Sequence, residues 1–182
     1  MAYRTITLLL VLLASIFASA AQTPAPYAGQ EKRAIKALSE TETRDLAEGR
    51  GMGLAKAAEL NSYPGPLHVL ELARELELSD SQRAASEALM APMRERAIAL
   101  GRQIIEAERD LDRAFAGRSI DQDYLRQQVA MIAALQGELR AVHLETHLAQ
   151  RAILTSDQIV RYDALRGYQP AAAHPSHRMH DH

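Results

Sequence analysis

The sequence predicts an all-α protein, and three observations support this fold class. Ala, Leu, Glu and Arg are the commonest residues, aromatic residues make up only 4% of the chain, and Trp and Cys are absent. This composition is typical of helical proteins with aliphatic cores. Capping-box patterns, in which Ser or Thr is followed three positions later by Glu or Gln, recur along the chain. Two long stretches also repeat apolar residues at steps of three, four and seven, as one face of a helix does.

The first twenty residues, MAYRTITLLLVLLASIFASA, have the pattern of a secretory signal peptide. One Arg precedes an apolar run from Ile6 to Phe17, and Ala18-Ser19-Ala20 supplies the small residues that signal peptidase recognises. The run is shorter than the roughly twenty residues of a membrane span. We therefore expect residues 1–20 to be removed after Ala20 and the protein to be exported, with an uncleaved N-terminal membrane anchor as the minority alternative.

The next two segments are expected to be a leader and a helical region. Residues 21–30 (AQTPAPYAGQ) contain two Pro and no apolar periodicity, which predicts a flexible leader. Residues 31–63 are expected to form an N-terminal helical segment, in which Ser39 and Glu42 match the capping box and Gly49 ends the helix. The residues of this segment indicate no function beyond packing on the helices that follow.

The remainder, residues 64–168, is expected to form one helical hairpin domain. Its helices are predicted at about residues 66–77, 80–116, 120–152 and 156–166. Pro64-Gly65-Pro66 breaks the chain before the first helix, and Gly117 and Gly167 end the first long helix and the last helix. At 1.5 Å per residue each long helix extends on the order of 50 Å. The short turn between the two long helices predicts an antiparallel hairpin, which Pro92 is expected to bend.

Capping signals and apolar stripes support these helices. The capping boxes are Ser79 with Gln82, Ser119 with Gln122, and Thr155 with Gln158. The first stripe contains Leu89, Met93, Ala97, Leu100, Ile104, Leu111 and Phe115, and the second contains Leu125, Val129, Ile132, Leu135, Leu139 and Val142. Two helices cannot cover both stripes completely, so the short helices or a second subunit must pack on them.

Charge and residue content exclude several classes of function. The formal net charge is −2, which provides no electrostatic basis for binding nucleic acid. The absence of Cys removes disulfides, thiolate metal sites and Cys nucleophiles together. No Gly-x-Ser-x-Gly motif or acid/base pair suggests catalysis, so we predict neither an enzyme nor an organic cofactor. A metal ion would have to be bound by His, carboxylate or Met side chains.

Two short motifs carry a family resemblance. Leu78, Ser79 and Gln82 in LSDSQ, and Leu154, Thr155 and Gln158 in LTSDQ, resemble the paired Leu-Thr-x-x-Gln motifs of the Spy/CpxP family of periplasmic stress proteins. Zinc-resistance-associated proteins and CnrX-like heavy-metal sensors belong to the same family. The resemblance covers about residues 64–168, and Ser79 replaces the usual Thr with the same capping chemistry.

The resemblance implies a periplasmic protein with four helices in a bent hairpin, often a homodimer with a concave face. It also implies one of three roles: an ATP-independent chaperone for unfolded client proteins, a modulator of a membrane signalling protein, or a metal sensor. The motif residues themselves are helix starts and indicate no reaction.

His143 and His147 are the first candidate metal ligands. At 100° per residue they point in the same directions as Leu125 and Val129 and therefore face inward. Two imidazoles one helical turn apart can reach one ion. The alternative is that both are core residues hydrogen-bonded to backbone or carboxylate groups. A zincin motif is absent because Leu144 follows the first His.

The family resemblance extends this pair to a fuller site. Its metal sensors take ligands from the short first helix and from a His-x-x-x-Met pair on the second long helix, where this chain has His in place of Met. Leu72 stands where a second His of the short helix would be expected, and Glu87 is the stand-in for an acidic ligand. The inward site implied by the resemblance is His68, Glu71, Glu87, His143 and His147.

The C-terminal residues 169–182 form a second candidate site. They contain four of the seven histidines and no periodic apolar face, which predicts a disordered, metal-collecting tail. Its expected ligands are His174, His177, Met179, His180 and His182. The alternative is a polar tail that increases solubility.

These observations predict a periplasmic protein that binds Zn, Ni, Co or Cu and acts in heavy-metal sensing or resistance. The alternative is a chaperone or envelope-stress modulator of the same fold without a specific metal site.

Overall fold

The computed structural model describes residues 25–168, so the predicted signal peptide and the His-rich tail lie outside the described residues. Among these residues, 25–31 belong to one unit and 32–168 to another. In the first unit, residues 25–31 form turns in which Ala28 N donates to Ala25 O (2.9 Å) and Gln30 Nε2 donates to Pro26 O (3.3 Å). The short 3-10 helix η1 (Gln30–Lys32) begins there.

The second unit consists of helices joined by turns. Its α-helices are α1 (Glu40–Glu48), α2 (Lys56–Glu59), α3 (Pro66–Glu71), α4 (Asp80–Ala116), α5 (Gln122–Ile153) and α6 (Ser156–Leu165). No strand occurs between residues 25 and 168, so the all-α prediction and the two long helices are confirmed. Within the same residues, no helix is both long enough and apolar enough to cross a membrane.

Three of the four predicted capping boxes are present, and the fourth is wrong. The boxes at Ser39, Ser79 and Thr155 form as expected. However, α5 is capped by Asp121, whose carboxylate accepts from Tyr124 N (2.8 Å). Ser119 lies two residues before this cap, and both its N–H (3.0 Å) and its hydroxyl (3.5 Å) donate to Ala114 O near the end of α4. Gly117 ends α4 as predicted, although with φ −79 it is not left-handed, and the left-handed residue of this turn is Arg118 (φ 52).

The short helix before the long pair is shorter than predicted. α3 ends at Glu71, and residues 72–77 form turns instead of continuing the helix. The chain tightens there, with Ala73 N donating to Leu70 O (3.2 Å). By contrast, α4 continues through Pro92 without interruption.

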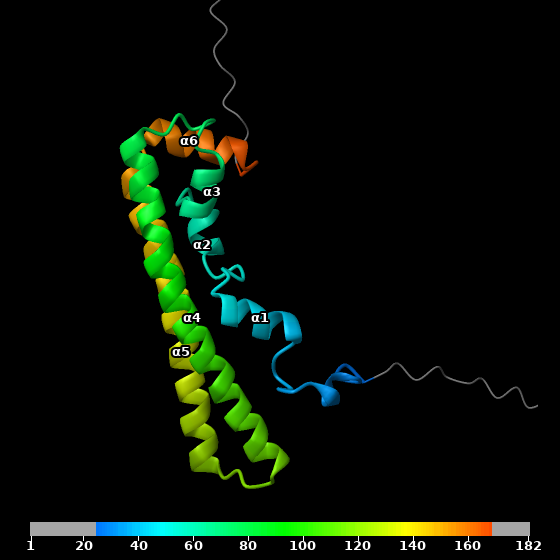
Figure 1. Cartoon of the computed structure of the whole chain (residues 1–182). Coiled ribbons are helices and arrows are strands. Elements are labelled where there is room, and N and C mark those ends of the chain that lie inside the picture. The colour runs from blue at the N-terminus through cyan, green and yellow to red at the C-terminus, as the bar shows by residue number, and fades with distance from the viewer. Residues whose placement is uncertain (1–24, 169–182) are drawn as a thin grey trace, which may run out of the picture. The chain divides into compact units, whose positions relative to one another are not determined.

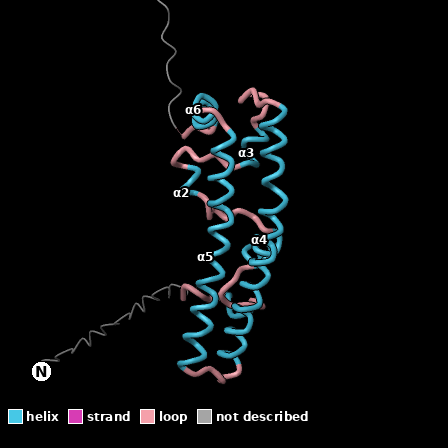
Figure 2. Tube along the Cα trace, turned by 90° about the vertical axis from the view of Figure 1, so that its left-hand side faces the viewer, coloured by secondary structure: helices cyan, strands magenta, loops and turns pink. Residues whose placement is uncertain are grey.

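The short helices pack on the two long ones. α4 and α5 lie side by side along most of their length, and α1, α2 and α3 pack on them (Figure 1). α6 lies at the end of the pair where α4 begins and α5 ends, as both views show (Figure 2). One hydrophobic cluster joins α1 to the long helices and contains Ile35, Leu46, Ala97, Ile104, Ile105 and Leu139. A second cluster joins α3 to α6 and contains Val69, Leu76, Leu154, Ile159 and Tyr162.

The predicted apolar stripes are only partly buried. Ala97, Ile104 and Val142 are almost fully buried. Phe115 and Val129, however, are 55% and 50% exposed, so their assignment to the core is wrong. Both lie toward the α4–α5 turn, beyond the part of the long helices that α1, α2 and α3 cover (Figure 1).

Reciprocal amide hydrogen bonds connect the two LTxxQ-like motifs. Gln82 Nε2 donates to Gln158 Oε1 (2.7 Å), and Gln158 Nε2 donates to Gln82 Oε1 (3.0 Å). Gln82 Nε2 also donates to Ile153 O (3.0 Å), and Gln158 Nε2 donates to Leu76 O (3.1 Å). Each Oε1 additionally accepts from the backbone N–H of its own N-cap residue. The motifs therefore start two helices and also join the ends of four chain segments.

We expect Gln82→Ala and Gln158→Ala each to lower the free energy of unfolding by about 1–3 kcal/mol, because each change leaves partly buried partners without hydrogen bonds. The double variant should cost clearly less than the sum of the two single changes, since both remove the same interaction. Urea unfolding of the four proteins measures this coupling.

Gln103→Ala is the matched control, because this amide donates to Ala99 O within its own helix at an exposed position. It should change stability by less than about 0.5 kcal/mol. Strictly additive costs for Gln82 and Gln158 would contradict the reciprocal arrangement.

α1 packs against α4 at a glycine. A Cβ added at Gly101 would lie 2.0 Å from the backbone oxygen of Leu46, so only hydrogen at this position lets the two helices approach so closely. In contrast, a Cβ added at Gly137 of α5 would meet nothing within 4 Å. Gly101 is therefore needed for packing, whereas Gly137 only lowers helix propensity.

Gly101→Ala and Gly137→Ala should consequently change stability in opposite directions. We expect the first to destabilise the fold by about 1–3 kcal/mol through overpacking. The second should stabilise α5 by up to about 1 kcal/mol. Thermal and urea unfolding test the pair, and stabilisation by both changes would refute the close approach of α1 to α4.

Candidate functional site

The predicted inward histidines line one cavity. This cavity has a volume of about 550 Å³ and lies between the end of α1, the start of α3, and the long helices α4 and α5. Its lining contains His68, His143, His147, Met90 and Met93. The structure thus brings together three of the five side chains of the predicted inward metal site.

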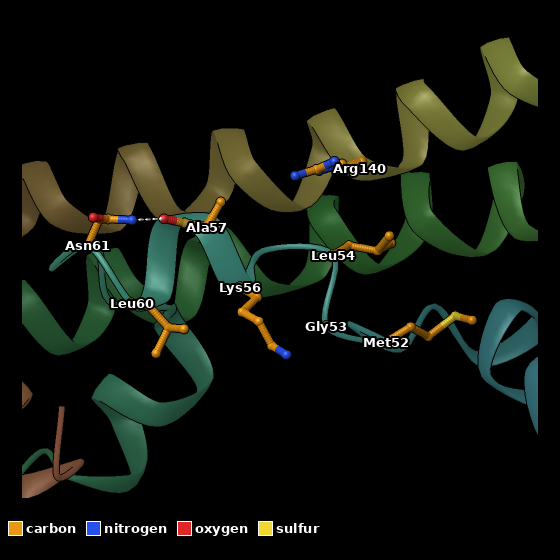
Figure 3. Close-up of a pocket in the computed structure, with 8 residues that line it drawn as sticks. All are labelled: Met52, Gly53, Leu54, Lys56, Ala57, Leu60, Asn61 and Arg140. Atoms are coloured by element: carbon orange, nitrogen blue, oxygen red, sulfur yellow. Dashed lines mark hydrogen bonds between the residues drawn. The ribbon is translucent and has the colours of Figure 1, made fainter.

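A neighbouring cavity has a different chemistry. Eight residues line this space of about 520 Å³, and its charged side chains are Lys56 and Arg140. Figure 3 shows its amide side chain, Asn61, turned back to donate to Ala57 O (2.8 Å). With two cations and neither carboxylate nor imidazole in its lining, this cavity has no donor set for a metal cation.

His143 is the most deeply placed imidazole of the site. The residue is 5% exposed, and its Nε2 atom is buried without a hydrogen-bond partner among the described residues. Burial, and then the neighbouring His147, lower the pKa of His143 below its usual value, so the ring is neutral at pH 7. A buried nitrogen without a partner costs about 1–3 kcal/mol, so this atom calls for an explanation such as a bound ion or water.

His147 has a defined tautomer. Its Nδ1 atom lies 2.7 Å from Tyr63 O, and since a carbonyl only accepts, the proton is on Nδ1. In the neutral ring, Nε2 then keeps its lone pair. Metal-binding histidines usually donate their second ring N–H to a backbone carbonyl or a carboxylate in this way. The Glu59 carboxylate also lies 3.6 Å from Nδ1.

Glu59 connects several elements around His147. Its side chain is only 13% exposed and accepts hydrogen bonds from Tyr162 OH, from Tyr168 OH (3.2 Å) and from Gly65 N (3.2 Å). Arg166 Nε lies 3.8 Å away. Burial, followed by the contact with Glu59, raises the pKa of the Tyr162 hydroxyl, so this hydroxyl remains a donor. α2, the Pro64-Gly65-Pro66 turn and α6 are thereby joined next to His147.

Sequence reasoning missed this group because residues 31–63 showed no functional pattern. Glu59 lies 103 positions from Tyr162 along the chain. A single Glu in a short helix carries no local signal of such a role.

The remaining residues of the predicted site lie farther from the histidine pair. His68 lines the cavity, but its Nδ1 is engaged by Glu71 Oε2 at 2.8 Å and its side chain is 37% exposed. Glu71 and Glu87 are exposed and do not belong to the cavity lining. On α4 the inward positions are Ser86, Met90 and Met93, which turn Glu87 away from the cavity.

No group of three or more His, Asp or Glu side chains within residues 25–168 is close enough together to hold a metal ion. The nitrogen and oxygen ligand set implied by the family resemblance is therefore not assembled in this arrangement. The structure adds two sulfur donors instead, Met90 and Met93. Met93 was predicted only as a stripe residue, and the three-residue spacing was the one sequence signal that both face the same side.

The predicted tail ligands His174, His177, Met179, His180 and His182 lie outside the described residues. Their role as a metal collector stays a prediction.

Comparison of this chain with family models, with curated proteins and with solved structures found no match.

Gly65 allows the chain to pass beside His147. A Cβ added at Gly65 would lie 2.8 Å from both Cε1 and Nε2 of that imidazole. Gly65→Ala should therefore displace the ring from Tyr63 O and destabilise the protein by about 1–3 kcal/mol. Urea unfolding measures the loss, and the NMR shifts of the His147 ring report its displacement.

Gly51→Ala is the control for the same cavity wall, because Gly51 also lines the cavity and an added Cβ there meets nothing within 4 Å. This variant should leave the His147 signals in place. Unchanged His147 signals in Gly65→Ala would contradict the tight contact.

Proposed function

We propose that this protein is a periplasmic metal-binding protein of the Spy/CpxP type that acts in heavy-metal sensing or resistance. The single observation that supports this best is the state of the histidine pair. His143 has a buried Nε2 without a partner, and His147 next to it on α5 holds its proton on Nδ1 toward Tyr63 O. Both line one cavity.

Metal binding would offset the energetic cost of burying the His143 Nε2 atom without a hydrogen-bond partner. Coordination through Nε2 gives His143 the partner that it lacks, and His147 needs no change of tautomer to coordinate. Because His143 is neutral through burial, no proton has to leave it before it binds an ion at neutral pH.

The family type is supported by the two motifs. They cap α4 and α6 with complete capping boxes, and their glutamines join each other across 76 positions of the chain. We assign α3, α4, α5 and α6 to the four-helix hairpin that the resemblance implies. Export to the periplasm follows from the signal-peptide pattern of residues 1–20.

Calorimetric titration with Zn, Ni, Co and Cu ions tests the proposal. The tail is silenced in the whole protein by changing its histidines, His174, His177, His180 and His182, to Ala. We expect one ion to bind this variant, and His143→Ala or His147→Ala to weaken binding about tenfold or more, which corresponds to about 1.4 kcal/mol.

Glu145→Gln is the matched control, since Glu145 lies between the two histidines on α5 but is exposed and pairs with Arg96 (3.2 Å). It should leave affinity unchanged. Binding that ignores both histidine variants, or is lost when the tail alone is silenced, would refute the site. Absence of binding together with suppressed aggregation of an unfolded client would favour the chaperone alternative.

A further inference from the structure

We infer that the cavity selects a soft monovalent ion, Cu(I), with the thioether sulfurs of Met90 and Met93 completing the coordination begun by His143 and His147. This inference rests on the proposed metal site and specifies its ion. Thioether donors favour soft ions such as Cu(I), whereas imidazole donors also suit Zn, Ni and divalent Cu, so the two sulfur atoms are what distinguishes Cu(I) at this site.

Met90 and Met93 come from the helix opposite the histidines. Both belong to α4, are half-buried and line the same cavity as His143 and His147 on α5. Fully buried Ser86 and Ala97 flank them on the same side of α4, which places this side against the rest of the helical bundle. One wall of the cavity is therefore lined by two imidazole side chains and another by two thioether side chains.

The carboxylates near the cavity are already engaged. Glu48 lines it, but its carboxylate lies 2.7 Å from Arg50 Nη2. Glu71 Oε2 is held 2.8 Å from His68 Nδ1. A hard divalent ion would have to break one of these pairs to obtain an anionic ligand, whereas Cu(I) can be held by neutral donors alone.

Positive charge in the cavity lining also favours a monovalent ion over a divalent ion. Arg50 and Arg94 both line the cavity. At equal distance a divalent ion is repelled by a guanidinium twice as strongly as a monovalent ion, because the Coulomb energy scales with the ion's charge. Arg50 is paired with Glu48 (2.7 Å) and Asp45 (3.5 Å), so Arg94 is the lining cation that disfavours a divalent ion more than a monovalent one.

Methionine can also serve only to fill space, because its flexible side chain adapts to irregular gaps. Substitution by Leu separates the two roles. Leu keeps the volume and apolar character, and such exchanges usually cost less than about 1.5 kcal/mol, but it provides no sulfur.

The test measures Cu(I) affinity anaerobically, by competition with a chromophoric Cu(I) chelator. The background protein has its tail silenced at the four histidines named above and at Met179→Leu. We expect Met90→Leu and Met93→Leu each to weaken Cu(I) binding about tenfold or more, while Zn binding and thermal unfolding change little. X-ray absorption should detect Cu–S scattering that disappears in the double variant.

Met131→Leu is the matched control, because Met131 lies on α5, is 41% exposed and does not line this cavity. It should leave Cu(I) affinity unchanged. If Cu(I) affinity and Cu–S scattering survive in the Met90/Met93 double variant but binding is lost in His143→Ala, the thioether inference is wrong and the histidine site remains. Equal losses of Zn and Cu(I) affinity in the methionine variants would also overturn it. If no ion binds through His143 and His147, the proposed function itself fails.

Discussion

The paired amides of Gln82 and Gln158 are the interaction on which the arrangement around the cavity depends. They join the starts of α4 and α6 to each other, and they also bind the backbone at Leu76, after α3, and at Ile153, at the end of α5. All donors and both acceptor oxygens of the pair are used, so the energetic cost of burying two amides is offset. α3 is thereby held beside α5, and its first turn is placed over the histidines.

The two α5 histidines of the cavity differ in their hydrogen bonding. His147 is fixed by Tyr63 O and lies beside the Glu59 network, whereas the buried Nε2 of His143 has no partner within the described residues. A protein that kept both imidazoles for stability alone would be expected to satisfy both. Gln150 of the same helix also has buried amide atoms without a partner among the described residues, so the proposed binding site rests on the position of His143 in the cavity lining as well.

The segment before the four-helix part completes the site. α1 reaches the long helices through the contact of Leu46 with Gly101, and its C-terminal end forms one wall of the cavity. α2 contributes Glu59, which lies beside His147. Without these elements the histidine pair would face a shallower groove open to water, in which weaker electrostatic interactions would be expected.

Local patterns in the sequence were sufficient for the helices and for part of the site. Capping chemistry and apolar periodicity depend on residues three to seven positions apart, so α1, α4 and α6 could be placed from their caps, and His143 and His147 could be paired on one face. The same reasoning failed where packing between distant segments decides burial. Its direction on the helix placed Val129 in the core, but this residue is 50% exposed.

Only the tertiary structure decided which distant residues are in contact. Tyr63 lies 84 positions from His147, and the methionines of α4 meet the histidines of α5 only after the chain has reversed. No local spacing records which side chains will share a cavity, because the packing of whole helices sets their distances. The histidine pair could be recognised in advance because both residues lie on one face of one helix. The roles of Glu59 and Met90 and the position of Glu87 could not.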